Sequence, residues 1–294
     1  MSRNMNEQAP NNVKIIGKLI ECSFREGTLK DGRKYESANY SVRVEQTYDG
    51  KTEISEIPLS TFATMYTNNG SVHPGYKTIQ DLKTLKTIQD YGEAEASRVR
   101  ISSANLRENN FMTRSGQLVN TWQINTSFCN NAGTASDIAN FQLVIFIMDM
   151  HDEIDREGDP TGRLIIKGGL VQFGGKLDVL EFVVEAPDKI NYIQHNWEIN
   201  STVIVNGRIR ITSQEVIKNA ETGSWGEEFS ETSTRMVREL VITGGSDNPI
   251  DEDNAYSTVD IKKAFNERKA RIEQLQIANA APKTTDNSSK YSWE

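Results

Sequence analysis

The stretch LIIKGGLVQFGGKLDVLEFVVEA, residues 164–186, decides the fold of this chain. Two apolar runs, 164–173 and 177–186, lie on either side of the Gly174-Gly175 pair, an arrangement typical of two antiparallel strands joined by a tight turn. Pro187 follows directly and predicts the start of a short helix, because proline is well tolerated in the first helical turn. The stretch therefore predicts a strand, a turn, a second strand and a helix.

The same order of elements continues on both sides of this stretch and also occurs earlier in the chain. In the later copy, strands are expected at 143–148, 164–173, 177–186, 203–211 and 236–243, with a helix from Pro187 to Trp197. In the earlier copy, strands are expected at 13–24, 40–48, 52–59, 98–106 and 118–128. The helix of the earlier copy is marked by the spacing of Tyr76, Ile79, Leu82, Leu85 and Ile88.

A helix between the third and fourth of five strands is the order of the OB-fold, a small Greek-key barrel that binds oligonucleotides and oligosaccharides. We therefore expect a mainly β protein with two tandem five-stranded OB-fold barrels, each with a helix between strands 3 and 4, and a C-terminal helix. Another all-β sandwich is the alternative. The expected segments are a flexible N-terminus at 1–12, barrels at 13–135 and 136–246, an acidic linker and helix at 247–278, and a disordered tail at 279–294.

The composition indicates a globular protein of the cytoplasm. The chain has 294 residues, of which 36% are hydrophobic and 25% are charged. Its longest apolar run is about six residues, whereas a membrane-spanning helix needs about twenty. The polar N-terminus lacks the apolar core of a signal peptide. Cys22 and Cys129 are the only cysteines, which favours a reducing compartment over a disulfide framework.

The net charge of −8 is unsuited to a nucleic-acid ligand, but the charge is unevenly distributed. Residues 1–135 hold 16 Lys and Arg against 14 Asp and Glu, a net charge of +2. Residues 136–246 hold 10 against 18, and residues 247–294 hold 7 against 9. We therefore expect the first barrel to be the better site for a polyanion. The acidic second half either keeps the protein soluble or competes with nucleic acid for the basic groove.

Signals of enzymatic chemistry are poor. The three histidines, His73, His151 and His195, have no zinc-like spacing with cysteine or with one another, and there is no phosphate-binding loop. The acidic cluster at 149–159 lacks the central glycine and terminal glutamate of a calcium-binding EF-hand loop. A solvated strand end and loop is the favoured interpretation of that cluster. We expect no catalytic residue, no metal site and no cofactor.

Basic and aromatic residues gather in the two connections that border the ligand channel of an OB barrel, between strands 1 and 2 and between strands 4 and 5. Cations can follow a phosphate backbone, and exposed rings can stack on bases. Phe111 lies outside any apolar alternation, so core and stacking roles stay open for it, whereas the core interpretation is favoured for Trp122. The candidate DNA-binding residues are Arg25, Lys30, Arg33, Lys34, Tyr35, Arg43, Arg98, Arg100, Arg107, Phe111, Arg114, Trp122, Arg208 and Arg210.

A helix is expected at residues 257–278, after an acidic linker. Its apolar stripe contains Ile261, Phe265, Ile272 and Leu275 and is interrupted by Arg268. Packing of this stripe on the barrels is the default interpretation. Pairing with a second copy and docking of a protein partner stay open.

Four motifs carry a resemblance to a known family, and they are Val13–Gly17, Ala104–Asn109, the pair Gly162–Leu164 and Phe182–Glu185, and Val237–Ser246. With them, nearly the whole chain resembles the tandem OB-fold single-stranded DNA-binding proteins of bacteriophages of Gram-positive bacteria. The resemblance implies a non-enzymatic role in replication or recombination of phage DNA in the host cytoplasm. The tail at 287–294 departs from better-known bacterial relatives because it is aromatic at its tip but not strongly acidic.

These observations predict a sequence-independent protein that coats and protects single-stranded DNA, with RNA left open as a ligand. Replication or recombination proteins are the expected partners of the C-terminal helix and tail, and self-association stays open. The alternative function is that of a non-enzymatic structural or assembly protein of a virion. A metal-dependent nuclease that uses the cluster at 149–159 is a weaker third interpretation.

Overall fold

The computed structural model describes residues 2–113, 115–126, 128–219 and 230–280, and the chain is mainly β. The elements of the first half are β1 (Asn11–Thr28), β2 (Lys34–Tyr48), β3 (Lys51–Thr64), α1 (Pro74–Leu82), α2 (Ile88–Tyr91), β4 (Arg98–Met112), β5 (Leu118–Thr126) and β6 (Asn130–Asn131). Those of the second half are β7 (Ile138–Ile154), β8 (Pro160–Val171), β9 (Leu177–Val184), α3 (Pro187–Asn196), β10 (Thr202–Asn219), β11 (Ser230–Gly245) and α4 (Thr258–Ala280).

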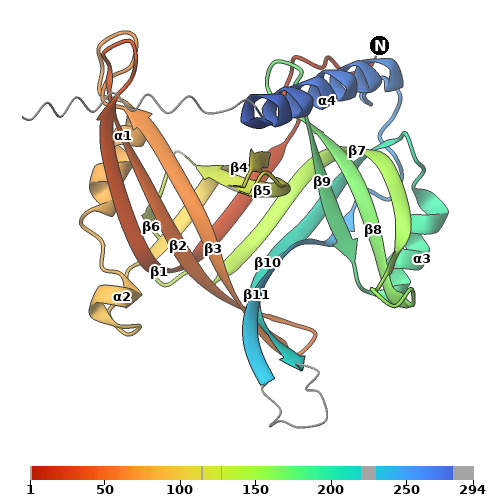
Figure 1. Ribbon diagram of the computed structural model, residues 1–294, viewed down its shortest axis with the longest axis horizontal. Coiled ribbons are helices and arrows are strands. Elements are labelled where there is room, and N and C mark those ends of the chain that lie inside the picture. Colours follow the sequence, from red (N-terminus) through yellow and green to blue (C-terminus); the bar gives the residue numbers. More distant parts are fainter. Residues whose placement is uncertain (1, 114, 127, 220–229, 281–294) are drawn as a thin grey trace, which may run out of the picture.

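The strand pairings of each half close on themselves. β1 pairs with β2, β2 with β3, β4 with β5 and β4 with β1, all antiparallel, while β3 and β5 are parallel at Ser60 and Asn125. We call this the first circuit. The second circuit, β7 to β11, repeats the order, with β9 and β11 parallel at Val183 and Val241. The helices α1 and α2 lie between β3 and β4, and α3 lies between β9 and β10 (Figure 1).

One antiparallel ladder joins the two circuits. Residues 11–16 of β1 pair with residues 138–143 of β7, so all the strands belong to a single sheet. Residues 13–18 of β1 also pair with β4, and the strand then pairs with β2. In the same manner, residues 140–146 of β7 also pair with β10, and the strand then pairs with β8. The repeated order of elements in the sequence therefore corresponds to a pseudo-symmetric arrangement of strands. One buried apolar cluster runs through both halves.

The expected mainly β fold and C-terminal helix are confirmed, but several strands are longer than predicted. β1 extends to Thr28 and β3 to Thr64, beyond the predicted ends at residues 24 and 59. The ladders continue through polar residues because backbone pairing does not require an apolar side chain on the solvent face. The helix expected around residues 76–88 is two helices, since the side chain of Thr87 accepts a hydrogen bond from the Asp90 N–H and starts α2 anew.

The N-terminal segment, which the sequence predicts to be flexible, contacts the body of the protein through several of its residues. Ala9 is buried, and the Arg3 N–H donates to the carbonyl oxygen of Ala255 at 2.8 Å. The side chain of Asn11 makes hydrogen bonds in both directions with the backbone of Leu106. This segment therefore lies between the first circuit and the residues before α4.

The helix α4 packs on the body of the protein through its first turns. Ile261 and Ala264 are buried in a second apolar cluster with Val144, Phe146 and Leu177. This supports the default interpretation of the apolar stripe. The expected tail lies outside the described residues from 281 onward. No helix in the described part of the chain is apolar and long enough to cross a membrane.

We predict that Gly207→Ala destabilises the fold. A Cβ atom at Gly207 would lie 2.3 Å from the Val241 carbonyl oxygen and 2.2 Å from the Phe141 ring, in a strand that shifts register there. The expected loss is about 1–3 kcal/mol of unfolding free energy, as for other overpacked sites. Gly244→Ala is the matched control, because a Cβ at Gly244 meets no atom within 4 Å. Thermal melts of the two variants with the same melting temperature would contradict the prediction.

Candidate nucleic-acid interface

The outer side of β2 and β3 carries an exposed aromatic pair. Ala38 and Tyr40 point into the core, so Tyr35 and its alternate neighbours point outward. On β3 the same alternation turns Phe62 outward, where 56% of its surface is exposed. The ring centroids of Tyr35 and Phe62 lie 5.0 Å apart. This pair presents aromatic surface to any ligand that lies across the two strands.

A groove of about 340 Å³ lies on the same side of the first circuit. We call this side, with its groove and its aromatic pair, the sheet face. Small polar side chains from five strands line the groove, and they are Ser23, Asn39, Ser41, Ser60, Asn109 and Gln123. Hydroxyl and amide groups can donate or accept hydrogen bonds with the edge of any base. The lining therefore suits the polar edges of bases and does not select one base over another.

Cations surround the sheet face. Arg25 pairs with Ser37, which pairs in turn with Phe62, so the three residues form one row across β1, β2 and β3. Arg25, Lys30 and Lys34 are exposed, and none has an ion-pair partner among the described residues. Arg33 differs because it pairs with Asp31 at 2.7 Å and lowers the pKa of that carboxyl mainly by a side-chain hydrogen bond. Three of the four predicted cations in this region are thus available to an anion.

The prediction of a loop at residues 107–114 is wrong, because β4 continues to Met112. Arg107 pairs with Gln123 and Phe111 with Val119, and both side chains lie on the solvent side of the hairpin. Arg107 is exposed, and 44% of the surface of Phe111 is exposed. The apolar alternation stops at Leu106, but the hairpin ladder continues through the polar residues that follow. Arg114 lies outside the described residues.

The remaining cations of the first half differ in their surroundings. Arg43 forms an ion pair of 3.6 Å with Glu93. Arg98 pairs with Asp137 at 2.5 Å and donates to the carbonyl of Ala135, so it holds the segment that connects the two halves. Arg100 is exposed on β4.

Arg208 and Arg210 lie in a network of carboxylates. Arg208 pairs with Glu53 at 3.2 Å and with Glu185 at 3.1 Å, and its guanidinium lies 4.2 Å from the centre of the Tyr48 ring. Arg210 pairs with Glu185 and Glu239. Burial raises the pKa of Glu239, but hydrogen bonds from Arg163 and Arg210 outweigh burial and leave this pKa below its ordinary value. These arginines are therefore engaged in holding β10 against neighbouring strands.

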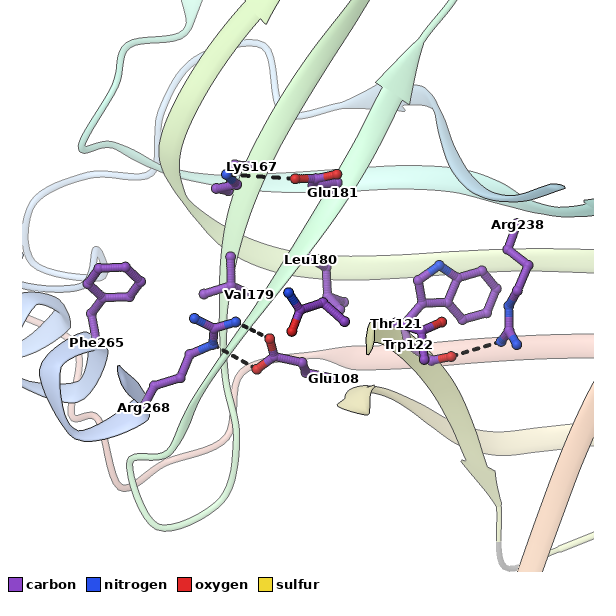
Figure 2. A pocket seen from close by; sticks show the side chains of 11 residues that line it. Glu108, Thr121, Trp122, Lys167, Val179, Leu180, Glu181, Arg238, Phe265 and Arg268 are labelled. Atoms are coloured by element: carbon purple, nitrogen blue, oxygen red, sulfur yellow. Dashed lines mark hydrogen bonds and ion pairs between the residues drawn. The ribbon is translucent and has the colours of Figure 1, made fainter. Parts of the chain in front are cut away.

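A second groove, of about 430 Å³, lies between the halves and is here called the seam groove (Figure 2). Its walls come from β4, β5, β8, β9, β11 and α4. Arg268 of α4 makes a bidentate ion pair with Glu108 of β4, with 2.8 Å between Nε and Oε2. Lys167 and Glu181 face each other at 3.7 Å. Phe265 adds an aromatic ring (Figure 2).

Trp122 and Arg238 lie at the seam. Trp122 is only 7% exposed, so it belongs mainly to the core. The Arg238 guanidinium lies 4.5 Å from the centre of its ring and donates to its carbonyl oxygen at 2.8 Å (Figure 2). Both residues line the sheet-face groove as well as the seam groove.

Phe62 and Arg238 are not among the candidate residues predicted from the sequence, although both leave a signal in it. The buried residues Leu59, Thr61 and Ala63 continue the alternation of β3, and this would have placed Phe62 on the solvent side. Alternate residues of a strand lie on the same side, so Arg238 lies on the side of the buried residues Leu240 and Ile242. It is therefore a charged residue on the apolar side of a strand. Such a residue is more informative than an exposed one.

Comparison with solved structures found likenesses at low sequence identity. The single-stranded DNA-binding protein of Thermus aquaticus has a TM-score of 0.52 and 10% identity, with 83% of this chain and 95% of that chain covered. A deletion variant of the same protein has a TM-score of 0.45 and 11% identity over 83% and 96% of the two chains. A replication protein A heterotrimer bound to single-stranded DNA has a TM-score of 0.21 and 10% identity over 92% and 71%. Only the first likeness is strong enough to indicate a shared OB-like fold.

The search of curated proteins found no match. The model of one protein family, YorF, matches residues 9–290, which include both circuits and α4. The chain is a member of the YorF family.

Proposed function

We propose that this protein binds single-stranded DNA without sequence preference and that each circuit is an OB-fold barrel. The observation that carries the proposal is the sheet face, where Phe62 of the Tyr35–Phe62 ring pair lies in one row with the unpaired cation Arg25. The order of pairing and the helix before the fourth strand of each circuit agree with the OB-fold, whose ligand lies on strands 2 and 3. The fold likeness to the Thermus aquaticus protein supports the same function.

Binding would combine two physical contributions. Arg25, Lys30, Lys34 and Arg107 neutralise phosphates and release condensed counterions. Phe62, Tyr35 and Phe111 offer ring faces to unpaired bases, and such stacking tolerates any base. The protein would act by equilibrium coating, without catalysis, and would keep the strand from pairing again.

The turn between β7 and β8 in the second circuit would bind DNA more weakly than the equivalent turn between β1 and β2 in the first circuit. The carboxylates of Asp155, Glu157 and Asp159 gather there, with ligand atoms within 4.8 Å of one another. Backbone hydrogen bonds from Asp159 and Glu157 lower the pKa of Asp155, so that carboxyl is ionised at neutral pH. A turn of this charge repels phosphate.

The biological setting is proposed from the resemblance of the sequence. In that setting the protein coats and protects single-stranded phage DNA during replication or recombination in the bacterial cytoplasm. The C-terminal helix and tail would contact replication or recombination proteins.

The direct test is a fluorescence-anisotropy titration of the full chain with a labelled dT30 strand, a 30-mer duplex and an rU30 strand at several salt concentrations. We expect dT30 to bind more tightly than the duplex, because only unpaired bases can stack, and its affinity to fall as salt rises. Binding of the duplex with equal or higher affinity would refute the proposal. The rU30 titration decides whether RNA is also a ligand.

We predict that Phe62→Ala weakens dT30 binding by about 1–3 kcal/mol, the usual contribution of a base–aromatic stack. The melting temperature should change little, since more than half of the ring surface is exposed. Phe173→Ala is the matched control, because Phe173 is 75% exposed in the turn between β8 and β9, away from the sheet face. Equal affinities of the two variants would remove Phe62 from the interface. The same comparison applies to Phe111→Ala.

Arg210→Gln should reduce stability and leave dT30 affinity unchanged. The change removes one of the two cations that contact each of Glu185 and Glu239, while Arg208 and Arg163 remain, at a cost of about 1–3 kcal/mol. Because the folded-state pKa of Glu239 is lowered, its stabilising contribution is present at neutral pH and disappears as the pH falls through that lowered value. The variant should lose part of this acid dependence in thermal melts from pH 7 to pH 3. Weaker dT30 binding by the folded variant would contradict this prediction and would show that Arg210 contributes to DNA binding.

A further inference from the structure

Arg238 differs from the arginines of β8, β10 and α4 with described ion pairs in having no counter-charge among the described side chains. Arg163, Arg210 and Arg268 each contact at least one carboxylate. None of the carboxylates whose side chains the structure describes lies within ion-pair distance of Arg238, and its Nε atom is buried without a hydrogen-bond partner. Burial also lowers the pKa of this arginine. The guanidinium keeps its charge nonetheless, because an arginine does not deprotonate in the physiological range.

The described contacts of Arg238 leave some of the N–H donors of its guanidinium group without an acceptor. The ring of Trp122 lies on one side and the Trp122 carbonyl accepts one N–H. A planar guanidinium offers five N–H donors in a geometry that matches two oxygens of a phosphate. A half-buried cation with free donors on the wall of a groove therefore suits an anionic ligand better than solvent.

The position of Arg238 connects two surfaces. It lines the sheet-face groove of the first circuit and, together with Trp122, the seam groove between the halves. Beyond Arg238, the seam groove presents Thr121 and the Phe265 ring, together with Lys167 and Arg268, whose charges are paired with Glu181 and Glu108 (Figure 2). A single strand that leaves the sheet face at Arg238 therefore meets a hydroxyl group and an aromatic ring in the seam groove. Among the cations that line this groove, Arg238 is the one without a carboxylate partner whose side chain the structure describes.

We propose that Arg238 binds a backbone phosphate at the point where one single strand passes from the sheet face into the seam groove, so that the strand contacts both halves. This inference rests on the proposed function and extends the path of the ligand beyond the first circuit.

The test uses Arg238→Gln and Arg238→Lys in the full chain, with anisotropy of labelled dT30 at several salt concentrations. We expect the glutamine variant to bind about tenfold more weakly, equivalent to about 1.4 kcal/mol. Its salt slope should fall by about 0.7, the contribution of one phosphate contact to a single strand, and the lysine variant should recover that slope. Arg156→Gln, which removes one charge from the exposed turn between β7 and β8, is the matched control and should bind as the wild type does.

Photocrosslinking of the wild-type protein tests the path without any substitution. A 30-mer with 5-iododeoxyuridine at all positions should crosslink to Phe62 or Tyr35 and also to Phe265, as identified by mass spectrometry of peptides. Crosslinks confined to the first circuit, or an unchanged affinity and salt slope in Arg238→Gln, would overturn the inference while wild-type binding of dT30 stands. Absence of wild-type binding would instead refute the proposed function itself.

Discussion

The ladder between residues 11–16 of β1 and 138–143 of β7 is the constraint on which the rest of the structure depends. Each of these two strands belongs to its own circuit and also pairs with a strand of the other circuit. Neither strand therefore presents an unpaired edge along this ladder. Because the backbones are held in register, the seam has a defined geometry, in which β5, β9, β11 and α4 meet. The bidentate pair of Arg268 with Glu108 and the network around Arg208 support this arrangement at separate places.

Charge compensation divides the arginines of this chain into two groups. Arg98, Arg208 and Arg210 contact carboxylates and hold segments that are far apart in the sequence. Arg25 and Arg238 have no such partner among the described residues, and each adjoins an aromatic surface beside a groove. An acidic protein can in this way present a cationic binding surface. Its carboxylates form ion pairs with arginines between strands, and the unpaired cations lie on the surface where a ligand would bind.

Much of the fold could be predicted from the sequence, because alternating apolar residues report which side of a strand is buried. The runs at 164–173 and 177–186, the helix after Pro187 and the apolar stripe of α4 all have counterparts in the structure. The prediction failed at residues 107–112 and 60–64, where polar side chains interrupt the alternation but backbone hydrogen bonds continue the ladder. The contacts of residues 2–12 could not be read from the sequence either, because they involve segments more than ninety residues away, as the hydrogen bonds of Asn11 with Leu106 show.

The sequence by itself determined the class of the fold, the repeated order of elements and the basic character of the first half, since these follow from local periodicity and composition. The tertiary structure alone decided which cations are free. Arg25 and Arg210 are equivalent as letters, but the first lies beside Ser37 on an open surface and the second lies between Glu185 and Glu239. Whether an arginine is paired depends on its distance to a carboxylate on another strand. The residue pattern along a single strand carries no information about that distance.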